Sequence, residues 1–296
     1  MLKLNKRKLP FVFIAFSYFY ACAAHAESCH ALLTAGKLES AIEAGRKQAD
    51  AEGWICAGRG LSASAKYPDA LAAFKRAESL ATSPYEKTLV AISTARTIRD
   101  SGDAEQAIAA YQRGFELATQ LKQKQGQLVN LNEMGQLLLA RSDVKVALER
   151  FTQAYSYTAN DNERAESNQL LASAYRQLGD YNHAIEHQLK GVLLERKSGD
   201  LGNFLYAELE LADLRILSKD FQAAQKDVED VLEKSREAQS DYWIARAQLY
   251  QGKLEIARGN SGAGKTILQQ SLALASKVGD ADLIQLITAA MEQRGP

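Results

Sequence analysis

The chain has 296 residues with 36 basic and 36 acidic side chains, so its formal net charge is zero. Four of the basic residues lie among the first eight, and residues 27–296 alone carry a net charge of −4. A mildly acidic chain lacks the basic patch by which proteins bind nucleic acids or anionic lipid surfaces. The charge therefore argues against both of these classes of partner.

Residues 1–26 have the three parts of a secretory signal peptide. A basic head from Lys3 to Lys8 is followed by the apolar run Leu9–Ala24 and by Ala24-His25-Ala26, which fits a small-residue cleavage site. We expect cleavage after Ala26, which places the mature protein in the periplasm or outside the cell. No later segment is apolar enough to suggest membrane insertion of the mature chain.

Two other interpretations of the same segment stay open. It could remain as an uncleaved membrane anchor, although the apolar run is shorter than the ~20 residues that cross a bilayer. It could also be a lipoprotein signal with Cys22 as the lipidated residue, although Phe19 and Tyr20 before it are bulkier than such signals usually carry.

Cys29 and Cys56 are the cysteines that remain after the expected cleavage. In an oxidising compartment a single pair near one end of a chain suggests a disulfide, which would secure the N-terminal end of the fold. The alternative is a pair of buried free thiols.

The mature chain is predicted to be helical nearly throughout. Its only prolines are Pro68, Pro84 and Pro296, and β-branched residues do not form alternating runs. Six segments share a turn followed by a small residue near the start of an amphipathic helix, with spacings of 29, 37, 40, 37 and 40 residues. The small residues are Ala41, Ala70, Ala107, Ala147, Ala184 and Ala224. Two helices in each period predict a helix–turn–helix solenoid.

These segments resemble the tetratricopeptide repeat (TPR) family. The clearest copy is Leu131–Tyr155, in which Met134-Gly135, Ala147 and Phe151 match the family's large–small–aromatic pattern. The resemblance implies an all-α, right-handed superhelical solenoid of about seven hairpins over residues 27–279, followed by a capping helix and tail over 280–296. Asp280 is the expected N-cap of that helix.

The chain departs from the family pattern in two ways. Periods of 37 and 40 residues exceed the usual 34, which predicts helices longer by about one turn. Arg215 and Glu255 stand where the pattern has a large apolar residue. The local signals nevertheless agree with helices, since Ser83-Pro84-Tyr85-Glu86 forms a predicted capping box.

The segment GNSGAGKT, Gly259–Thr266, matches the phosphate-loop pattern G-x-x-x-x-G-K-[ST]. A phosphate loop joins a strand to a helix, whereas residues 241–258 have the pattern of a repeat helix. The repeat spacing also places a turn at Gly259-Asn260 and puts Gly264 where the other repeats have their small residue. We therefore expect no nucleotide site, with Gly264 in a packing role.

Other candidate sites are weak. His183 and His187 have metal-competent spacing, but no third ligand is near them in the repeat, so a solvated helix face is expected. The sequence predicts no cofactor, no metal site and no nucleophilic grouping, and hence no enzyme. The aromatic clusters Tyr242-Trp243 and Tyr155/Tyr157 are interpreted as packing between hairpins, with a contact site as the alternative.

The resemblance implies a binding groove lined by the first helix of each hairpin. On this chain the polar side chains at those positions are Arg59, Arg96, Arg99, Asn132, Gln136, Gln169, Ser173, Arg176, Asp213 and Lys253. Five are basic and one is acidic, which predicts a locally positive groove for a protein or peptide partner. The family's two-carboxylate clamp, a Lys and an Asn one turn apart on the first helix, is absent. The resemblance therefore does not imply binding of chaperone tails.

The expected function is therefore an exported TPR scaffold of the bacterial cell envelope that recognises its partners through a preformed groove. One alternative is a periplasmic sensory or regulatory module that acts in trans on a signalling receptor. An enzyme is the third interpretation. The sequence does not indicate an oligomeric state.

Overall fold

The computed structural model describes residues 28–292, and in this range all regular structure is helical. The predicted signal peptide, Cys22 included, lies outside the described residues. The helices of the described range are α1 Cys29–Thr34, α2 Leu38–Gln48, α3 Ala51–Ala63, α4 Tyr67–Leu80, α5 Pro84–Asp100, α6 Ala104–Gln120, α7 Lys124–Ala140, α8 Val144–Tyr155, α9 Asp161–Leu178, α10 Tyr181–Ser198, α11 Leu201–Leu217, α12 Phe221–Glu237, α13 Asp241–Ala257, α14 Ser261–Val278 and α15 Ala281–Glu292.

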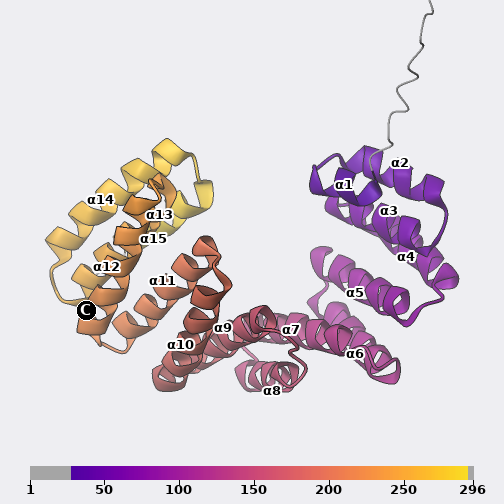
Figure 1. Ribbon diagram of the computed structural model, residues 1–296, viewed down its shortest axis with the longest axis horizontal. Helices are drawn as coiled ribbons and strands as arrows, with labels where there is room; N and C mark the ends of the chain where they lie inside the picture. The colour runs from indigo at the N-terminus through magenta and orange to yellow at the C-terminus, as the bar shows by residue number, and fades with distance from the viewer. Residues whose placement is uncertain (1–27, 293–296) are drawn as a thin grey trace, which may run out of the picture.

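The helices pack in chain order as seven hairpins, α1–α2 to α13–α14, which α15 follows. Figure 1 shows that the stack bends into an arch, with α5, α7, α9 and α11 toward the hollow and α6, α8 and α10 along the outer side. Each first helix also contacts the first helix of a neighbouring hairpin, as in α5·α7, α7·α9 and α11·α13. The all-α solenoid expected from the repeats is therefore confirmed.

The expected small residues sit at the closest points between helices. Ala41, Ala70, Ala107, Ala147, Ala184 and Ala224 are all fully buried. Aromatic rings cover neighbouring glycines in the same way in two repeats: a Cβ on Gly58 would come within 2.6 Å of Phe74, and one on Gly135 within 2.5 Å of Phe151. Small residues thus let each hairpin close while rings fill the space beside them.

Local capping agrees with the sequence signals. The Ser83 hydroxyl accepts a hydrogen bond from the Glu86 amide at 3.1 Å, and the Glu86 carboxylate accepts one from the Ser83 amide at 2.9 Å. This reciprocal pair is the predicted capping box at the start of α5. Asp280 likewise accepts from the Leu283 amide at 2.7 Å at the start of α15.

Nine of the helices from α5 onward in the described range have 17 or 18 residues, as the long periods predict, and α8 and α15 are shorter with 12 each. The two polar departures from the family pattern have polar partners. Arg215 pairs with the buried carboxylate of Asp227, and Glu255 accepts from Arg258 at 3.0 Å and from Asn260 at 2.8 Å.

The segment GNSGAGKT forms a turn and the first turns of α14. It follows helix α13, not a strand, and Gly259 adopts φ 91° in the turn. Gly264 is buried, and a Cβ there would come within 2.6 Å of Ile256 and 2.8 Å of the Gly252 carbonyl oxygen. Gly264 therefore has the packing role that the sequence predicts. The size limit at this position is stricter than expected, because even alanine would crowd α13.

The two ends of the described chain are closed differently. At the start, Cys29 and Cys56 are joined by a disulfide with their Cα atoms 6.2 Å apart, which ties α1 to α3. At the end, α15 buries Leu283, Ile287 and Ala290 against the core of the last hairpins. Between residues 28 and 292, no helix has both the length and the apolar character needed to cross a membrane.

Candidate partner-binding groove

The ten predicted groove residues all lie on first helices of the hairpins. Arg59 is on α3, Arg96 and Arg99 are on α5, two are on α7, three on α9, and Asp213 and Lys253 are on α11 and α13. The structure gathers the charged residues among them into two clusters, one spanning α3, α5 and α7 and the other spanning α9, α11 and α13. These are named the N-terminal and C-terminal clusters.

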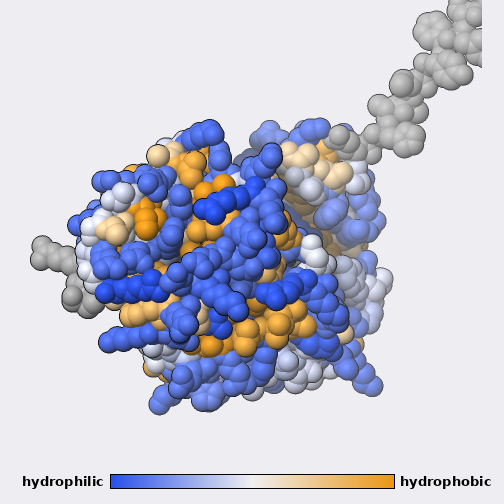
Figure 2. Space-filling model, turned by 60° about the vertical axis from the view of Figure 1, so that its left-hand side comes forward, coloured by the Kyte–Doolittle hydropathy of each residue, from blue (hydrophilic) through white to orange (hydrophobic). Residues whose placement is uncertain are grey.

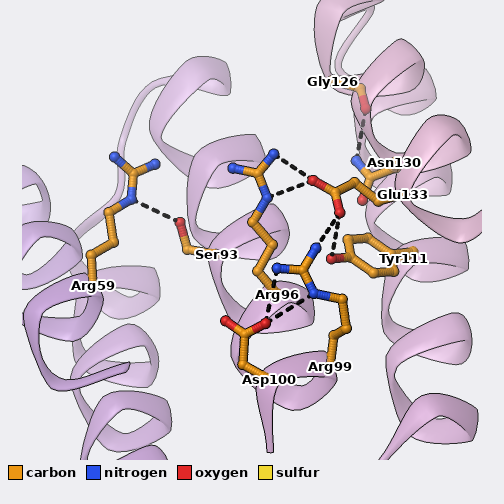
Figure 3. Close-up of polar contacts among 9 residues, drawn as sticks. All are labelled: Arg59, Ser93, Arg96, Arg99, Asp100, Tyr111, Gly126, Asn130 and Glu133. Atoms are coloured by element: carbon orange, nitrogen blue, oxygen red, sulfur yellow. Dashed lines mark hydrogen bonds and ion pairs between the residues drawn. The ribbon is translucent and has the colours of Figure 1, made fainter. Parts of the chain in front are cut away.

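Glu133 of α7 is the centre of the N-terminal cluster (Figure 3). Its Oε1 accepts hydrogen bonds from Arg96 Nε at 2.8 Å and Nη2 at 2.6 Å, and its Oε2 accepts one from Arg99 Nη1 at 2.5 Å. The hydroxyl of Tyr111 donates to Oε2 at 3.3 Å, and Arg99 also pairs with Asp100 at 2.9 Å. Two arginines of α5 thus share one carboxylate of the next inner helix.

Arg59 differs from these two arginines. Its Nε donates to the Ser93 hydroxyl at 3.3 Å, and among the described residues no carboxylate pairs with it. Burial, and then the positive charge of Arg96, lower the pKa of Arg59. The N-terminal cluster therefore holds one cation whose charge is not balanced by an ion pair.

Two acidic residues of α11 organise the C-terminal cluster. Asp213 is 2% exposed, and its carboxylate pairs with Arg176 of α9 on one side and Lys253 of α13 on the other. Glu210 accepts from Arg176 at 3.4 Å and from the Tyr250 hydroxyl at 2.8 Å. Burial and the neighbouring Glu210 raise the pKa of Tyr250, so this hydroxyl remains a donor.

Aromatic rings extend the C-terminal cluster. The guanidinium of Arg246 lies 4.9 Å from the ring centre of Tyr206 and 6.0 Å from that of Tyr242, whose hydroxyl accepts its hydrogen bond at 2.7 Å. A cavity of about 220 Å³ between α9 and α11 is lined by Ser173, Arg176, Tyr206 and Glu210, among others. The cluster therefore offers ring faces, donors and acceptors around one hollow.

Two of the predicted residues do not line the groove. Asn132 is 4% exposed and Asp213 is 2% exposed, so neither side chain can contact a partner directly. The predicted positive character is also reduced, because Glu133 and Glu210 neutralise part of the basic charge. Both acids were missed by the sequence analysis, although each lies one repeat beyond an arginine that it pairs with: Glu133 37 residues after Arg96, and Glu210 34 after Arg176.

The two histidines that the sequence offered as metal candidates pack against a tyrosine. His183 and His187 both stack on Tyr175, with ring centres 5.0 and 5.5 Å away, and their Nδ1 atoms contact Asp180 and Asn168. Within residues 28–292 no group of three or more His, Cys, Asp or Glu side chains could hold a metal ion.

The aromatic pairs also have ring neighbours. Tyr242 and Trp243 pack edge to face at 5.0 Å against the C-terminal core, and Tyr157 packs edge to face on Phe115 at 6.3 Å. Tyr155 remains 39% exposed. On the face seen in Figure 2, apolar areas are divided by bands of hydrophilic side chains.

Comparisons with known proteins support the fold alone. No family model matches the sequence, and no curated protein sequence matches it. The tetratricopeptide repeat sensor STAND protein PH0952 of Pyrococcus horikoshii shares 13% identity at a TM-score of 0.72, over 88% of this chain and 43% of that one. The C-terminal part of a TPR repeat-containing protein from Cytophaga hutchinsonii shares 16% identity at a TM-score of 0.59, over 87% and 97% of the two chains.

A Rap protein complexed with Competence and Sporulation Factor shares 10% identity at a TM-score of 0.56, over 89% of this chain and 82% of that one. At these identities the likeness defines the class of fold and leaves the partner open. The described part of the chain has a TPR-like fold.

Proposed function

We propose that this protein is an exported scaffold of the bacterial cell envelope that binds a protein or peptide segment in the groove formed by its first helices. The observation that carries the proposal is the pair of polar clusters on these helices. Each cluster ties successive inner helices together through ion pairs, so the groove is preformed and little conformational entropy is lost when a partner binds.

The mechanism is recognition, not bond chemistry. Exposed donors lie beside each cluster, with Gln136 one turn after Glu133 on α7 and Ser173 one turn before Arg176 on α9. The arginines offer planar donors to backbone carbonyls or carboxylates. A Rap protein of similar fold is solved in complex with Competence and Sporulation Factor, which supports binding of a partner by this class of solenoid. Export is supported by the predicted signal peptide.

Site-specific photo-crosslinking tests the groove directly. A photoreactive amino acid is placed at Gln136 or Ser173 on the inner helices α7 and α9, and at Lys145 or Glu186 on the outer helices α8 and α10 of the same hairpins. We expect adducts from the inner positions and none from the outer ones, in cells that make the protein. Adducts confined to the outer positions, or none at all, contradict the proposal.

A second candidate function is a regulatory module acting in trans, which the similarity to a TPR sensor favours. The same adducts separate the two, since mass spectrometry identifies the crosslinked protein as a signalling receptor or as a structural envelope component. Export is tested separately by cell fractionation and by N-terminal sequencing of the mature protein, which should begin at Glu27.

A further inference from the structure

A small apolar hollow lies beside the N-terminal cluster, between α5 and α7. The cavity has about 180 Å³ and is lined on its apolar side by Tyr85, Leu89, Ile92 and Val129, with Arg96 at its edge. Tyr85 is 65% exposed, which is unusual for a large ring. The volume is below that of pockets for whole small ligands, and suits one large apolar side chain.

Beside this hollow, the basic side chains outnumber the acidic side chains that pair with them. Arg96 and Arg99 share Glu133, and Arg99 also pairs with Asp100, while among residues 28–292 the partner of Arg59 is the Ser93 hydroxyl. Figure 3 shows the side chains of Arg59 and Arg96 on either side of Ser93. Ser93, the partner of Arg59, lies on α5 between Ile92 and Arg96, which both line the hollow, so the cation and the apolar cavity are neighbours on one face.

A partly buried cation without a counter-ion is costly, and an incoming carboxylate lowers that cost. We propose that Arg59 and the hollow between α5 and α7 recognise a partner segment in which an Asp or Glu side chain stands beside a large apolar residue. The carboxylate pairs with Arg59, and the apolar side chain fills the hollow. This inference rests on the proposed function, because it names the chemistry of the segment that the groove accepts.

The probe is a fluorescent eight-residue peptide with blocked ends and a central Glu-Leu in a Ser/Ala background, measured by fluorescence anisotropy. Matched peptides carry Gln-Leu or Glu-Ser, and a fourth has Gln-Leu with a free C-terminal carboxylate. We expect wild-type protein to bind the Glu-Leu peptide about tenfold more tightly than either single replacement, since one charge-assisted contact accounts for roughly that factor.

Variants assign the two halves of the site. Arg59→Gln should remove the preference for Glu-Leu over Gln-Leu, while Val129→Asp should remove the preference for Glu-Leu over Glu-Ser. Lys145→Gln on the outer helix α8 removes the same charge as Arg59→Gln and should leave all affinities unchanged. Circular dichroism melts establish that each variant is folded.

Equal affinity for Glu-Leu and Gln-Leu peptides, or an equal loss for both on Arg59→Gln, overturns the proposal. Binding only by the peptide with the free C-terminus overturns the side-chain assignment. The crosslinking result is independent of these peptides. Adducts from Gln136 or Ser173 without any Glu-Leu preference would keep the groove and reject this site, whereas absent adducts reject the proposed function itself.

Discussion

Arg96 of α5 and Glu133 of α7 are 37 residues apart in the chain, and Arg96 Nη2 lies 2.6 Å from Glu133 Oε1. The same separation of 37 residues joins Arg176 to Asp213, on the inner helices of later repeats. The first helices joined by each pair begin 40 residues apart, so a separation of 37 places each acid about one helical turn before the point equivalent to its arginine in the neighbouring hairpin. Ion pairs between first helices therefore recur along the groove, and they contribute to holding its inner wall.

The substitution Glu133→Gln should lower the stability of the fold and, at the same time, strengthen the binding of acidic peptides. Glu133 is acceptor to two arginines and to Tyr111, so the change weakens charge-assisted hydrogen bonds and should cost about 1–2 kcal/mol, since the arginines can still reach water. The freed arginines should then bind an acidic peptide more tightly. Hydrogen exchange of α5 and α7 measures the loss of stability, and fluorescence anisotropy measures the affinity for the peptide.

The matched control is Glu149→Gln, which removes an exposed carboxylate on the outer helix α8. It should change neither the exchange of α5 and α7 nor peptide affinity. If Glu133→Gln left both quantities at their wild-type values, the bridging role of Glu133 would be wrong.

The fold could be predicted from the sequence because its determinants are local or periodic. A single alanine such as Ala147 marks the close approach within each hairpin, and Ser83 with Glu86 marks a helix start within four residues. The outer helices also carry one apolar stripe, because they pack on one side only.

The site could be predicted only in part. Inner helices such as α7 and α11 contact neighbours on several sides, so their apolar residues do not single out one exposed face. Asn132 and Asp213 were therefore placed in the groove although they are buried. Glu133 and Glu210 could have been found by pairing arginines with acids one repeat later, but which of several nearby acids is the partner depends on side-chain geometry.

Gly264→Ala should destabilise the last hairpin by about 1–3 kcal/mol, although alanine favours helix. Its Cβ would meet Ile256 Cγ1 at 2.6 Å and the Gly252 carbonyl oxygen at 2.8 Å, so α13 and α14 would have to separate. Gly262→Ala is the matched control, because a Cβ there meets nothing within 4 Å and helix propensity should stabilise by about 0.5–1 kcal/mol. Thermal melts compare the two variants.

If this segment were a phosphate loop, its lysine would be needed for nucleotide binding. Lys265 is exposed, so Lys265→Ala should leave the melting temperature unchanged. ATP affinity that disappears on Lys265→Ala would show that the motif has a nucleotide role after all.

Removal of the Cys29–Cys56 disulfide should loosen the first hairpins and leave the rest of the stack intact. The bond closes a loop with a sequence separation of 27, for which chain entropy predicts about 3 kcal/mol of stabilisation. The double change to serine should increase hydrogen exchange in α1–α3, while α9–α14 remain protected because each repeat contacts mainly its neighbours. Free thiols titrated in protein purified without reductant would contradict the bond.

Two buried acids on α11 and α12 should make the protein less stable as the pH rises from about 5 to 7. Burial, and next the charge of Asp227, raise the pKa of Glu208 to about 7, while burial raises that of Asp227 to about 6 despite its pairing with Arg215. One carboxylate oxygen of each is buried and finds no hydrogen-bond partner within residues 28–292, and Arg196 lies 3.7 Å from Glu208. Both carboxyl groups therefore bind their protons more tightly in the folded protein than in the unfolded chain.

The sign of the effect follows from that difference in proton binding. Above the unfolded pKa of about 4.5 the unfolded chain binds fewer protons, so the free energy of unfolding falls as pH rises and reaches its full loss above pH 7. Glu208→Gln imitates the protonated form, so it should matter little at pH 5 but raise stability by up to about 3 kcal/mol at pH 8. Glu233→Gln on the exposed side of α12 should leave the pH dependence unchanged. Parallel wild-type and Glu208→Gln stability curves from pH 5 to 8 would show that Glu208 is already charged throughout.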